Sequence, residues 1–119
     1  FEKDVIENVF GSVGQAKNTA VVSETVRGKL VNTIPDVLGR PTGLTEIKNV
    51  EYLTLSPQLR AQLGYATQHG MPYNLIVNPA TRISQPVIDA ISKVNMASGN
   101  IGGIYRYDPV TKALIDFVK

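Results

Sequence analysis

The sequence predicts an α/β fold in which helices flank a mixed central sheet. Its apolar patterns indicate, in order, a helix, several strands, a helix, a strand, a helix and a hairpin. A serine with a proline one or two residues later, which is typical of helix starts, occurs at Ser56-Pro57 and again at Ser84-Gln85-Pro86. The 119 residues, 43% hydrophobic and 18% charged, suffice for one core, so we expect a single domain over residues 1–119.

The first quarter of the chain combines a helix with a hairpin. Residues 2–13 carry apolar side chains at helical spacing and acidic side chains in the first turn, where they favour the helix dipole. Two β-type runs follow, at residues 20–22 and 30–31, with a turn at residues 27–29 between them. The sequence therefore predicts a helix and then two short strands.

The next segment predicts a second pair of strands. Pro35 ends or distorts the first ladder because it lacks a backbone donor, and such a distortion re-aims its neighbour Asp36. The glycine and proline cluster at residues 39–43 then returns the chain antiparallel into a strand over residues 44–50. We expect Asp36 to come from the strand that precedes this one.

Helices and strands alternate in the second half. The helix that begins at Ser56 extends to Gly70, and residues 73–77 form a buried strand because they are short, apolar and rich in β-formers. A shorter helix begins at Ser84, whose hydroxyl we expect to cap it. Residues 104–107 and 113–118 predict the final hairpin.

Composition excludes several kinds of chemistry. The chain has no cysteine, so it forms no disulfide and no thiolate metal site. His69 is the only histidine, which rules out paired-histidine catalysis, and its position before Gly70 favours capping of a helix end over metal binding. A charge of +2 and a pI near 9.0 permit a nucleic-acid partner without requiring one.

The sequence contains no membrane-spanning stretch and no recognisable export signal. No stretch reaches the length of a membrane-spanning helix, so we expect no stable membrane association. The chain begins on Phe1 without the features of a signal peptide. We therefore expect it to be a piece of a longer polypeptide, with export directed by another part.

An acid and a base share one face of the strand at residues 44–50. Side chains alternate along a strand, so Glu46 and Lys48 lie roughly 7 Å apart on the face that also carries Leu44. A charge on a mostly apolar strand is costly unless it is paired, binds a metal or serves catalysis. With Asp36 as a second carboxylate, the pattern can hold a divalent cation. The alternative for a Glu-x-Lys pattern is an exposed ion pair.

Three motifs resemble those of a known nuclease family. Pro35-Asp36, Glu46-Ile47-Lys48 and Gln58-Leu59-Arg60 resemble the PD-(D/E)xK nucleases, and more narrowly the restriction-endonuclease-type toxin domains at the C-termini of bacterial polymorphic toxins. These include contact-dependent inhibition and type VI effectors. Further matching pieces occur in the same order: Phe1-Glu2, Lys17-Asn18-Thr19 and Thr81-Arg82-Ile83-Ser84. The resemblance covers nearly the whole chain and implies a restriction-endonuclease-like layered fold.

The resemblance also implies roles for five residues. Asp36 and Glu46 correspond to the metal-binding carboxylates, and Lys48 to the residue that orients or deprotonates the attacking water and neutralises charge on the phosphate. Glu2 corresponds to an acid on the first helix that completes or positions the metal shell. Gln58 corresponds to a helix-borne polar group near the scissile phosphate. The implied cofactor is Mg²⁺ or another divalent cation such as Mn²⁺ or Zn²⁺.

Substrate-binding residues are less sharply defined. The resemblance implies that Arg60 and Arg82 contact phosphates, although each is also a common surface residue. Thr81 and Ser84 either touch nucleic acid or form a loop and a helix cap. The run Tyr105-Arg106-Tyr107 either stacks on bases or provides ordinary cross-strand packing.

The predicted function is that of a metal-dependent endonuclease toxin used in bacterial competition. DNA is the favoured substrate because relatives on this fold mostly cut DNA. Cleavage of transfer RNA is one alternative, and a non-catalytic nucleic-acid or protein-binding module is another. Such a toxin implies a cognate immunity protein that is acidic or able to plug the site. We expect delivery as part of a larger toxin and action in the cytoplasm of the target cell.

Overall fold

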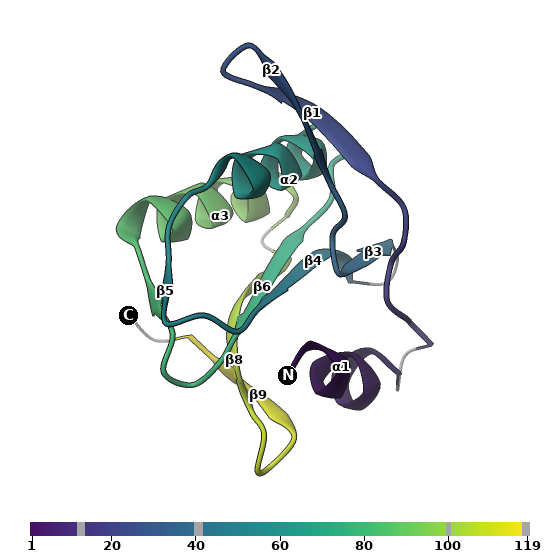
Figure 1. The fold of residues 1–119 in the computed structure, drawn as a ribbon, viewed down its shortest axis with the longest axis vertical. Coiled ribbons are helices and arrows are strands. Elements are labelled where there is room, and N and C mark those ends of the chain that lie inside the picture. Colours follow the sequence, from purple (N-terminus) through teal and green to yellow (C-terminus); the bar gives the residue numbers. More distant parts are fainter. Residues whose placement is uncertain (12–13, 40–41, 100, 118–119) are drawn as a thin grey trace.

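The computed structural model describes residues 1–11, 14–39, 42–99 and 101–117. Its central feature is a five-stranded mixed sheet (Figure 1). The three inner strands are parallel to one another, and each edge strand is antiparallel to its neighbour. In spatial order the strands are β3 (Val37–Gly39), β4 (Gly43–Lys48), β6 (Tyr73–Val77), β8 (Gly103–Asp108) and β9 (Ala113–Asp116). The predicted mixed sheet is confirmed.

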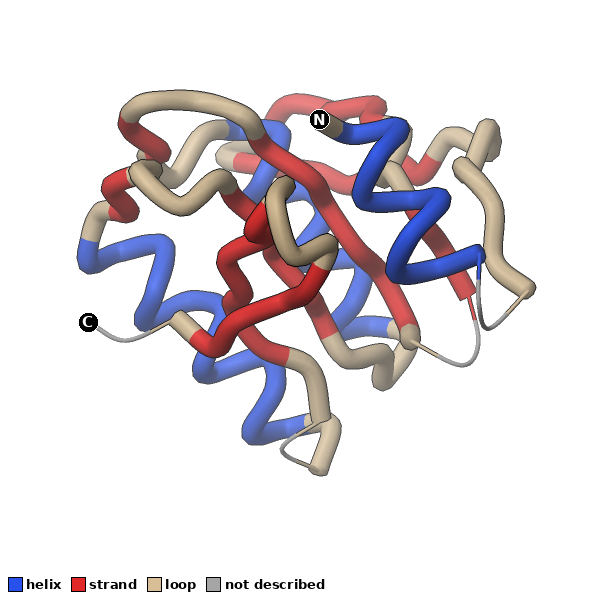
Figure 2. Tube along the Cα trace, turned by 90° about the horizontal axis from the view of Figure 1, so that it is seen from below, coloured by secondary structure: helices blue, strands red, loops and turns tan. Residues whose placement is uncertain are grey.

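Helices cover both faces of this sheet (Figures 1 and 2). On one face, helices α2 (Pro57–Gln68) and α3 (Gln85–Ala97) pack against apolar side chains of β4 and β6. On the other face, α1 (Glu2–Val5) and the π-helical turn η1 (Ile6–Phe10) pack against a second apolar cluster. Alternation along β4 explains the two clusters, since Leu44 belongs to the first and Ile47 to the second. The layered α/β prediction is therefore confirmed.

The N-terminal helix differs from its prediction. We predicted one helix over residues 2–13, but the α-helical part ends at Val5 and the chain continues with the wider π-type hydrogen bonding of η1. Residues 12–13 lie outside the described part of the chain. Helical periodicity correctly indicated the buried side chains Val5 and Phe10, but it does not distinguish 3.6 residues per turn from a wider local turn.

The first two strands form a hairpin apart from the main sheet. β1 (Val22–Val26) and β2 (Lys29–Thr33) pair antiparallel and pack on α2 (Figure 1). Arg27 and Gly28, both at positive φ, form the two-residue turn between them. The predicted turn is confirmed, but the first strand begins only at Val22, the last residue of its predicted run, and continues through polar residues that also pair. The second strand extends past its apolar run on both sides.

The predicted strand over residues 44–50 is two residues too long. β4 ends at Lys48. Its last residue pairs with Val77, the last residue of β6, and β3 pairs only with its first three residues. The Val50 carbonyl instead accepts a hydrogen bond from the Thr81 hydroxyl, at 2.7 Å. Two short strands, β5 (Tyr52–Leu53) and β7 (Arg82–Ile83), then form a separate parallel pair.

The helix boundaries confirm one predicted cap and correct another. The Ser56 hydroxyl accepts a hydrogen bond from the Leu59 amide at 3.2 Å, as predicted. The Ser84 hydroxyl makes no cap bond and is buried without a partner, so the expected cap at α3 is wrong. His69 ends α2 with Nδ1 2.9 Å from the Tyr65 carbonyl oxygen, in agreement with the capping interpretation. No helix in the described part of the chain combines the length and apolar character needed to cross a membrane.

Candidate active site

Two buried carboxylates lie side by side where β3 meets β4. Asp36 directly precedes β3, and because Val37 pairs with Thr45 in an antiparallel ladder, Asp36 lies beside Glu46. Oδ2 of Asp36 accepts a hydrogen bond from the Ile47 amide at 2.7 Å. Asp36 is 7% exposed and Glu46 only 3%. The antiparallel pairing of β3 with β4 therefore brings both carboxyl groups to one place.

Lys48 provides a cation beside this pair. Its Nζ atom lies 3.4 Å from Oε2 of Glu46, and its side chain is 28% exposed. The second oxygen of Glu46, Oε1, is buried and has no hydrogen-bond partner. An exposed surface ion pair, which was the alternative for the Glu-x-Lys pattern, does not fit a glutamate buried to this degree.

Burial and mutual repulsion shift the ionisation of the two acids in opposite directions. Burial, followed by the negative charge of Asp36, raises the pKa of Glu46 to about 7, and Lys48 only partly offsets this. Burial also acts to raise the pKa of Asp36, but the influence of Glu2, the Ile47 amide, Glu46 and Lys17 outweighs it and lowers that pKa. Near neutral pH, Asp36 is therefore the ionised partner and Glu46 is partly protonated.

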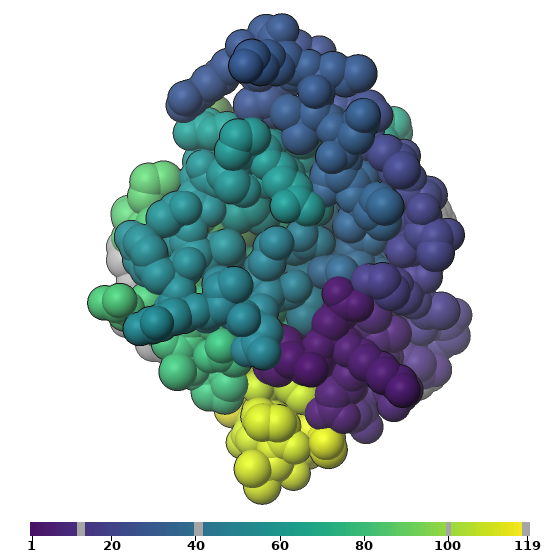
Figure 3. Space-filling model, in the orientation of Figure 1, coloured from purple at the N-terminus to yellow at the C-terminus, as the bar shows by residue number. Residues whose placement is uncertain are grey.

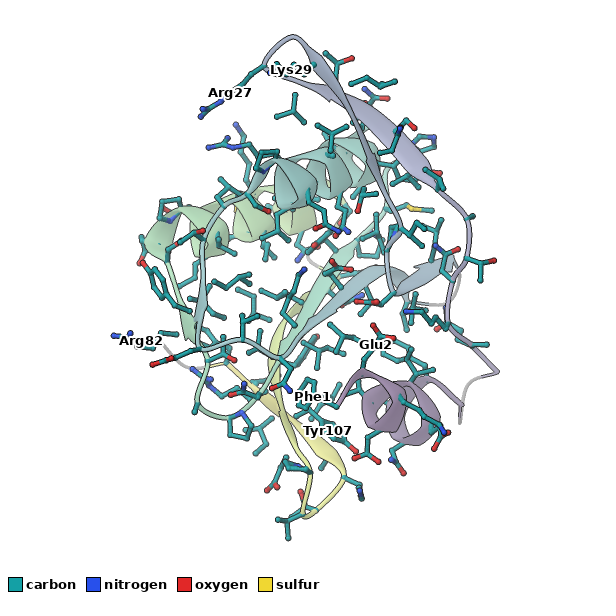
Figure 4. The ribbon with its side chains drawn as sticks, viewed as in Figure 1. Phe1, Glu2, Arg27, Lys29, Arg82 and Tyr107 are labelled. Atoms are coloured by element: carbon teal, nitrogen blue, oxygen red, sulfur yellow. The ribbon has the colours of Figure 1, made fainter. Side chains whose placement is uncertain are left out.

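Glu2 reaches this cluster from α1. Figure 4 shows Glu2 at the end of α1 that faces the sheet. Its Oε2 atom accepts a hydrogen bond from Lys17 Nζ at 2.6 Å, and the same Nζ atom lies 3.3 Å from Oδ1 of Asp36. The structure thus brings Glu2 to the predicted carboxylates, while its metal-related role stays a prediction.

A second glutamine of α2, Gln62, lies one turn after the predicted Gln58. Gln62 is buried, donates to the Thr33 hydroxyl at 2.9 Å, and is one of the groups that lower the pKa of Glu46. The Tyr73 hydroxyl donates to Oε1 of Gln62 at 2.7 Å. Gln58 is exposed and joins the same network from outside, donating to the Thr33 hydroxyl at 3.1 Å. Sequence reasoning missed Gln62, although a polar residue on the apolar face of α2 is a usable signal.

The two predicted phosphate-binding arginines lie outside the cluster. Arg82 is exposed on β7 with its guanidinium 5.5 Å from the centre of the Tyr52 ring, and Figure 4 shows it far from Glu2. Arg60 is half-buried on α2, and within the described residues no hydrogen bond or ion pair links it to the carboxylates. The proposed substrate contacts of both residues stay predictions.

Tyr107 and Thr81, for which contact with nucleic acid was an alternative, are both packed inside the protein. Tyr107 is fully buried, its hydroxyl donates to Asp4 at 3.0 Å, and Phe1 packs edge-on against its ring. A side chain in that position does not stack on a base, so cross-strand packing is the correct interpretation for Tyr107. Thr81 is fully buried and shapes the loop through its bond to Val50.

The number of carboxylates and the partners of their oxygen atoms indicate whether a metal ion fits between Asp36 and Glu46. Within the ranges that the structure describes, no group of three or more histidine, cysteine, aspartate or glutamate residues is arranged around one position suited to a metal. A cation at this place would therefore have two buried protein carboxylates beside it, Asp36 and Glu46, rather than three. The partnerless Oε1 of Glu46 fits this use, because a buried carboxylate oxygen without a donor is stabilised by a cation.

Comparison with known protein families identifies a matching family. The family model described as restriction endonuclease fold toxin 7 (Tox-REase-7) matches residues 5–87. This range includes Asp36, Glu46, Lys48 and the Gln58-Leu59-Arg60 helix start, and leaves Glu2 outside. The searches of curated proteins and of solved structures found no match. Because the matched range covers more than half of the chain, the chain belongs to the restriction endonuclease fold toxin family Tox-REase-7.

Proposed function

We propose that this domain is a metal-dependent endonuclease that hydrolyses phosphodiester bonds, with DNA as the favoured substrate. Membership of a restriction endonuclease fold toxin family supports a nuclease toxin in general. The observation that carries the finer proposal is the paired burial of Asp36 and Glu46, with one Glu46 oxygen free of partners and Lys48 Nζ 3.4 Å from the other. Such a group is expensive to bury and gains its stabilisation from a bound cation.

Each residue of the cluster has a distinct part in this proposal. Asp36 and Glu46 would hold a divalent cation, which lowers the pKa of water and offsets charge on a phosphate. Lys48, the more exposed partner, would orient the attacking water and donate to the phosphate. Gln62, fixed by its bonds to Thr33 and Tyr73, is one of the groups that favour the ionised form of Glu46. Two oxygen ligands without cysteine or histidine suit Mg²⁺ or Mn²⁺ better than Zn²⁺.

Exposed positive charge supports an anionic polymer as the substrate. The β1–β2 hairpin projects from the body of the molecule, and its tip carries Arg27 and Lys29 (Figures 3 and 4). Both side chains are exposed, and within the described residues neither has an acidic partner. Thr33, at the other end of β2, bonds to Gln58 and Gln62, so the same hairpin is anchored at the candidate active site.

Incubation of the purified domain with plasmid DNA and with total transfer RNA, with and without EDTA, tests the proposal. We expect plasmid cleavage in Mg²⁺, no cleavage in EDTA, and recovery when Mg²⁺ is added in excess. Cleavage of transfer RNA alone would identify an RNase instead. Cleavage that EDTA leaves unchanged would contradict a metal-dependent mechanism, and absence of cleavage of either substrate would favour a non-catalytic binding module.

The proposal extends to a protein partner and a delivery route. A free nuclease would attack the nucleic acid of the cell that makes it, so we propose a cognate immunity protein that is acidic or plugs the site. The domain would travel as part of a larger toxin, for example in contact-dependent inhibition or type VI secretion, and act in the cytoplasm of the target cell. Membership of a toxin family supports delivery into target cells.

A further inference from the structure

Lys17 places a positive charge directly on the candidate metal site. Its Nζ atom lies 2.6 Å from Oε2 of Glu2 and 3.3 Å from Oδ1 of Asp36. An ordinary lysine side chain is a cation at neutral pH, and two carboxylates at ion-pair distance favour that charged form. Lys17 lies in the segment between η1 and β1. It belongs to the matching piece Lys17-Asn18-Thr19, to which no role was assigned.

The backbone around Lys17 is fastened to the peptide that carries Asp36. The Asn18 amide donates to the Asp36 carbonyl at 2.8 Å. The Asn18 side chain donates to the Pro35 carbonyl at 3.0 Å and to the Ala20 carbonyl at 2.8 Å. The lysine side chain itself is 52% exposed. Its ammonium group can therefore leave Asp36 by rotation of side-chain bonds while the backbone stays in place.

The contacts of the two buried acids show where an added cation would meet Lys17. Oδ2 of Asp36 accepts from the Ile47 amide, and Oδ1 is the oxygen that faces Lys17. On the neighbouring acid, Oε2 faces Lys48 and Oε1 has no partner. A cation shared by Asp36 and Glu46 therefore finds one vacant oxygen on Glu46 and an ammonium group already at Asp36.

We propose that Lys17 is a built-in counter-ion of this site, which neutralises Glu2 and Asp36 in the metal-free protein and exchanges with the divalent cation at Asp36. This inference rests on the proposed function, because it needs a cation at Asp36 and Glu46. Two positive charges a few ångströms apart repel each other, so the ammonium group opposes metal binding until it moves away. In exchange, it limits repulsion among the carboxylates while no metal is bound.

Replacement of Lys17 by methionine separates these two effects. Met keeps most of the aliphatic chain and removes the charge. By isothermal titration calorimetry with Mn²⁺, we expect Lys17→Met to bind the ion about tenfold more tightly than the unmodified domain. In EDTA, the same variant should have the lower melting temperature, because Glu2 and Asp36 lose their counter-ion. Mn²⁺ should then raise its melting temperature by more than that of the unmodified domain.

Lys3→Met is the matched control. Lys3 lies next to Glu2 in α1, is 89% exposed and contacts only Glu7, at 4.0 Å, among the described acidic residues. We expect its Mn²⁺ affinity to match that of the unmodified domain. A Lys17→Met variant that binds Mn²⁺ equally or more weakly would show a purely structural role and overturn this inference alone. An unmodified domain that binds no Mn²⁺ would overturn the inference together with the proposed metal dependence.

Discussion

Replacement of Lys48 by alanine is expected to lower the rate of nucleic-acid cleavage by about 10²- to 10³-fold, with the fold retained. Lys48 Nζ is 3.4 Å from Glu46, and the side chain lies at the edge of the buried pair. Its loss removes the cation that pairs with Glu46 and the group proposed to act on water and phosphate. The initial rate of plasmid nicking in Mg²⁺ measures the effect, and circular dichroism melting checks the fold.

The matched control for this change is Lys93→Ala on α3. Lys93 is exposed, and within the described residues it takes part in no ion pair, so the control removes the same charge away from the site. We expect its cleavage rate to equal that of the unmodified domain. Nicking by Lys48→Ala at the unmodified rate would remove Lys48 from the mechanism and favour a scaffold without this chemistry.

Replacement of Glu46 by glutamine is expected to abolish metal-dependent cleavage and, at the same time, to stabilise the metal-free protein above neutral pH. Burial and the neighbouring Asp36 raise the pKa of Glu46 to about 7, so the folded protein resists ionising this group. Glutamine has the same shape without the charge, and its amide group can donate to the Asp36 carboxylate. We expect a gain on the order of 2 kcal/mol in unfolding free energy at pH 8 in EDTA.

The expected gain depends on pH in a defined direction. Below the ordinary glutamate pKa of 4.5, Glu46 is protonated in both the folded and unfolded states. Ionisation of Glu46 then contributes no difference in stability between the two proteins. Between pH 4.5 and about 7, the folded state binds more protons than the unfolded state, and the unmodified domain loses stability as pH rises. The difference between the two proteins should therefore grow over this window and then level off.

Urea unfolding at a series of pH values in EDTA measures this difference. The same titration with Mn²⁺ should restore stability to the unmodified domain and leave Glu46→Gln unchanged, because only the carboxylate attracts the ion. A Glu46→Gln variant that is equally stable at all pH values would show that Glu46 is not held under electrostatic strain. A variant that still cleaves DNA in Mg²⁺ would exclude Glu46 as a ligand.

The core of the site could be predicted from sequence because it is local. Asp36, Glu46 and Lys48 lie on a strand–turn–strand unit, where the turn residues set the connection and alternation sets the face. The spacing also placed Glu46 on the face shared with Leu44, which packs under α2 and α3. Family resemblance added the expected pairing of these three residues as one site.

The surroundings of the site could not be predicted, because tertiary contacts create them. Lys17 reaches Asp36 from a segment 19 residues away, and no periodic pattern indicates where an irregular segment will fold back. The choice of Gln62 over Gln58 depends on how α2 is rotated against the sheet. Arg82 was assigned by order along the chain alone, and the β5–β7 pairing carries it away from the carboxylates.

Anomalous diffraction from crystals soaked in Mn²⁺ tests most directly whether Asp36 and Glu46 act together. We predict one strong peak within about 2.5 Å of a carboxylate oxygen of each residue in the unmodified domain, and loss of that peak in Glu46→Gln. A peak bound to other residues, or one that persists unchanged in Glu46→Gln, would show that these two acids do not form the metal site.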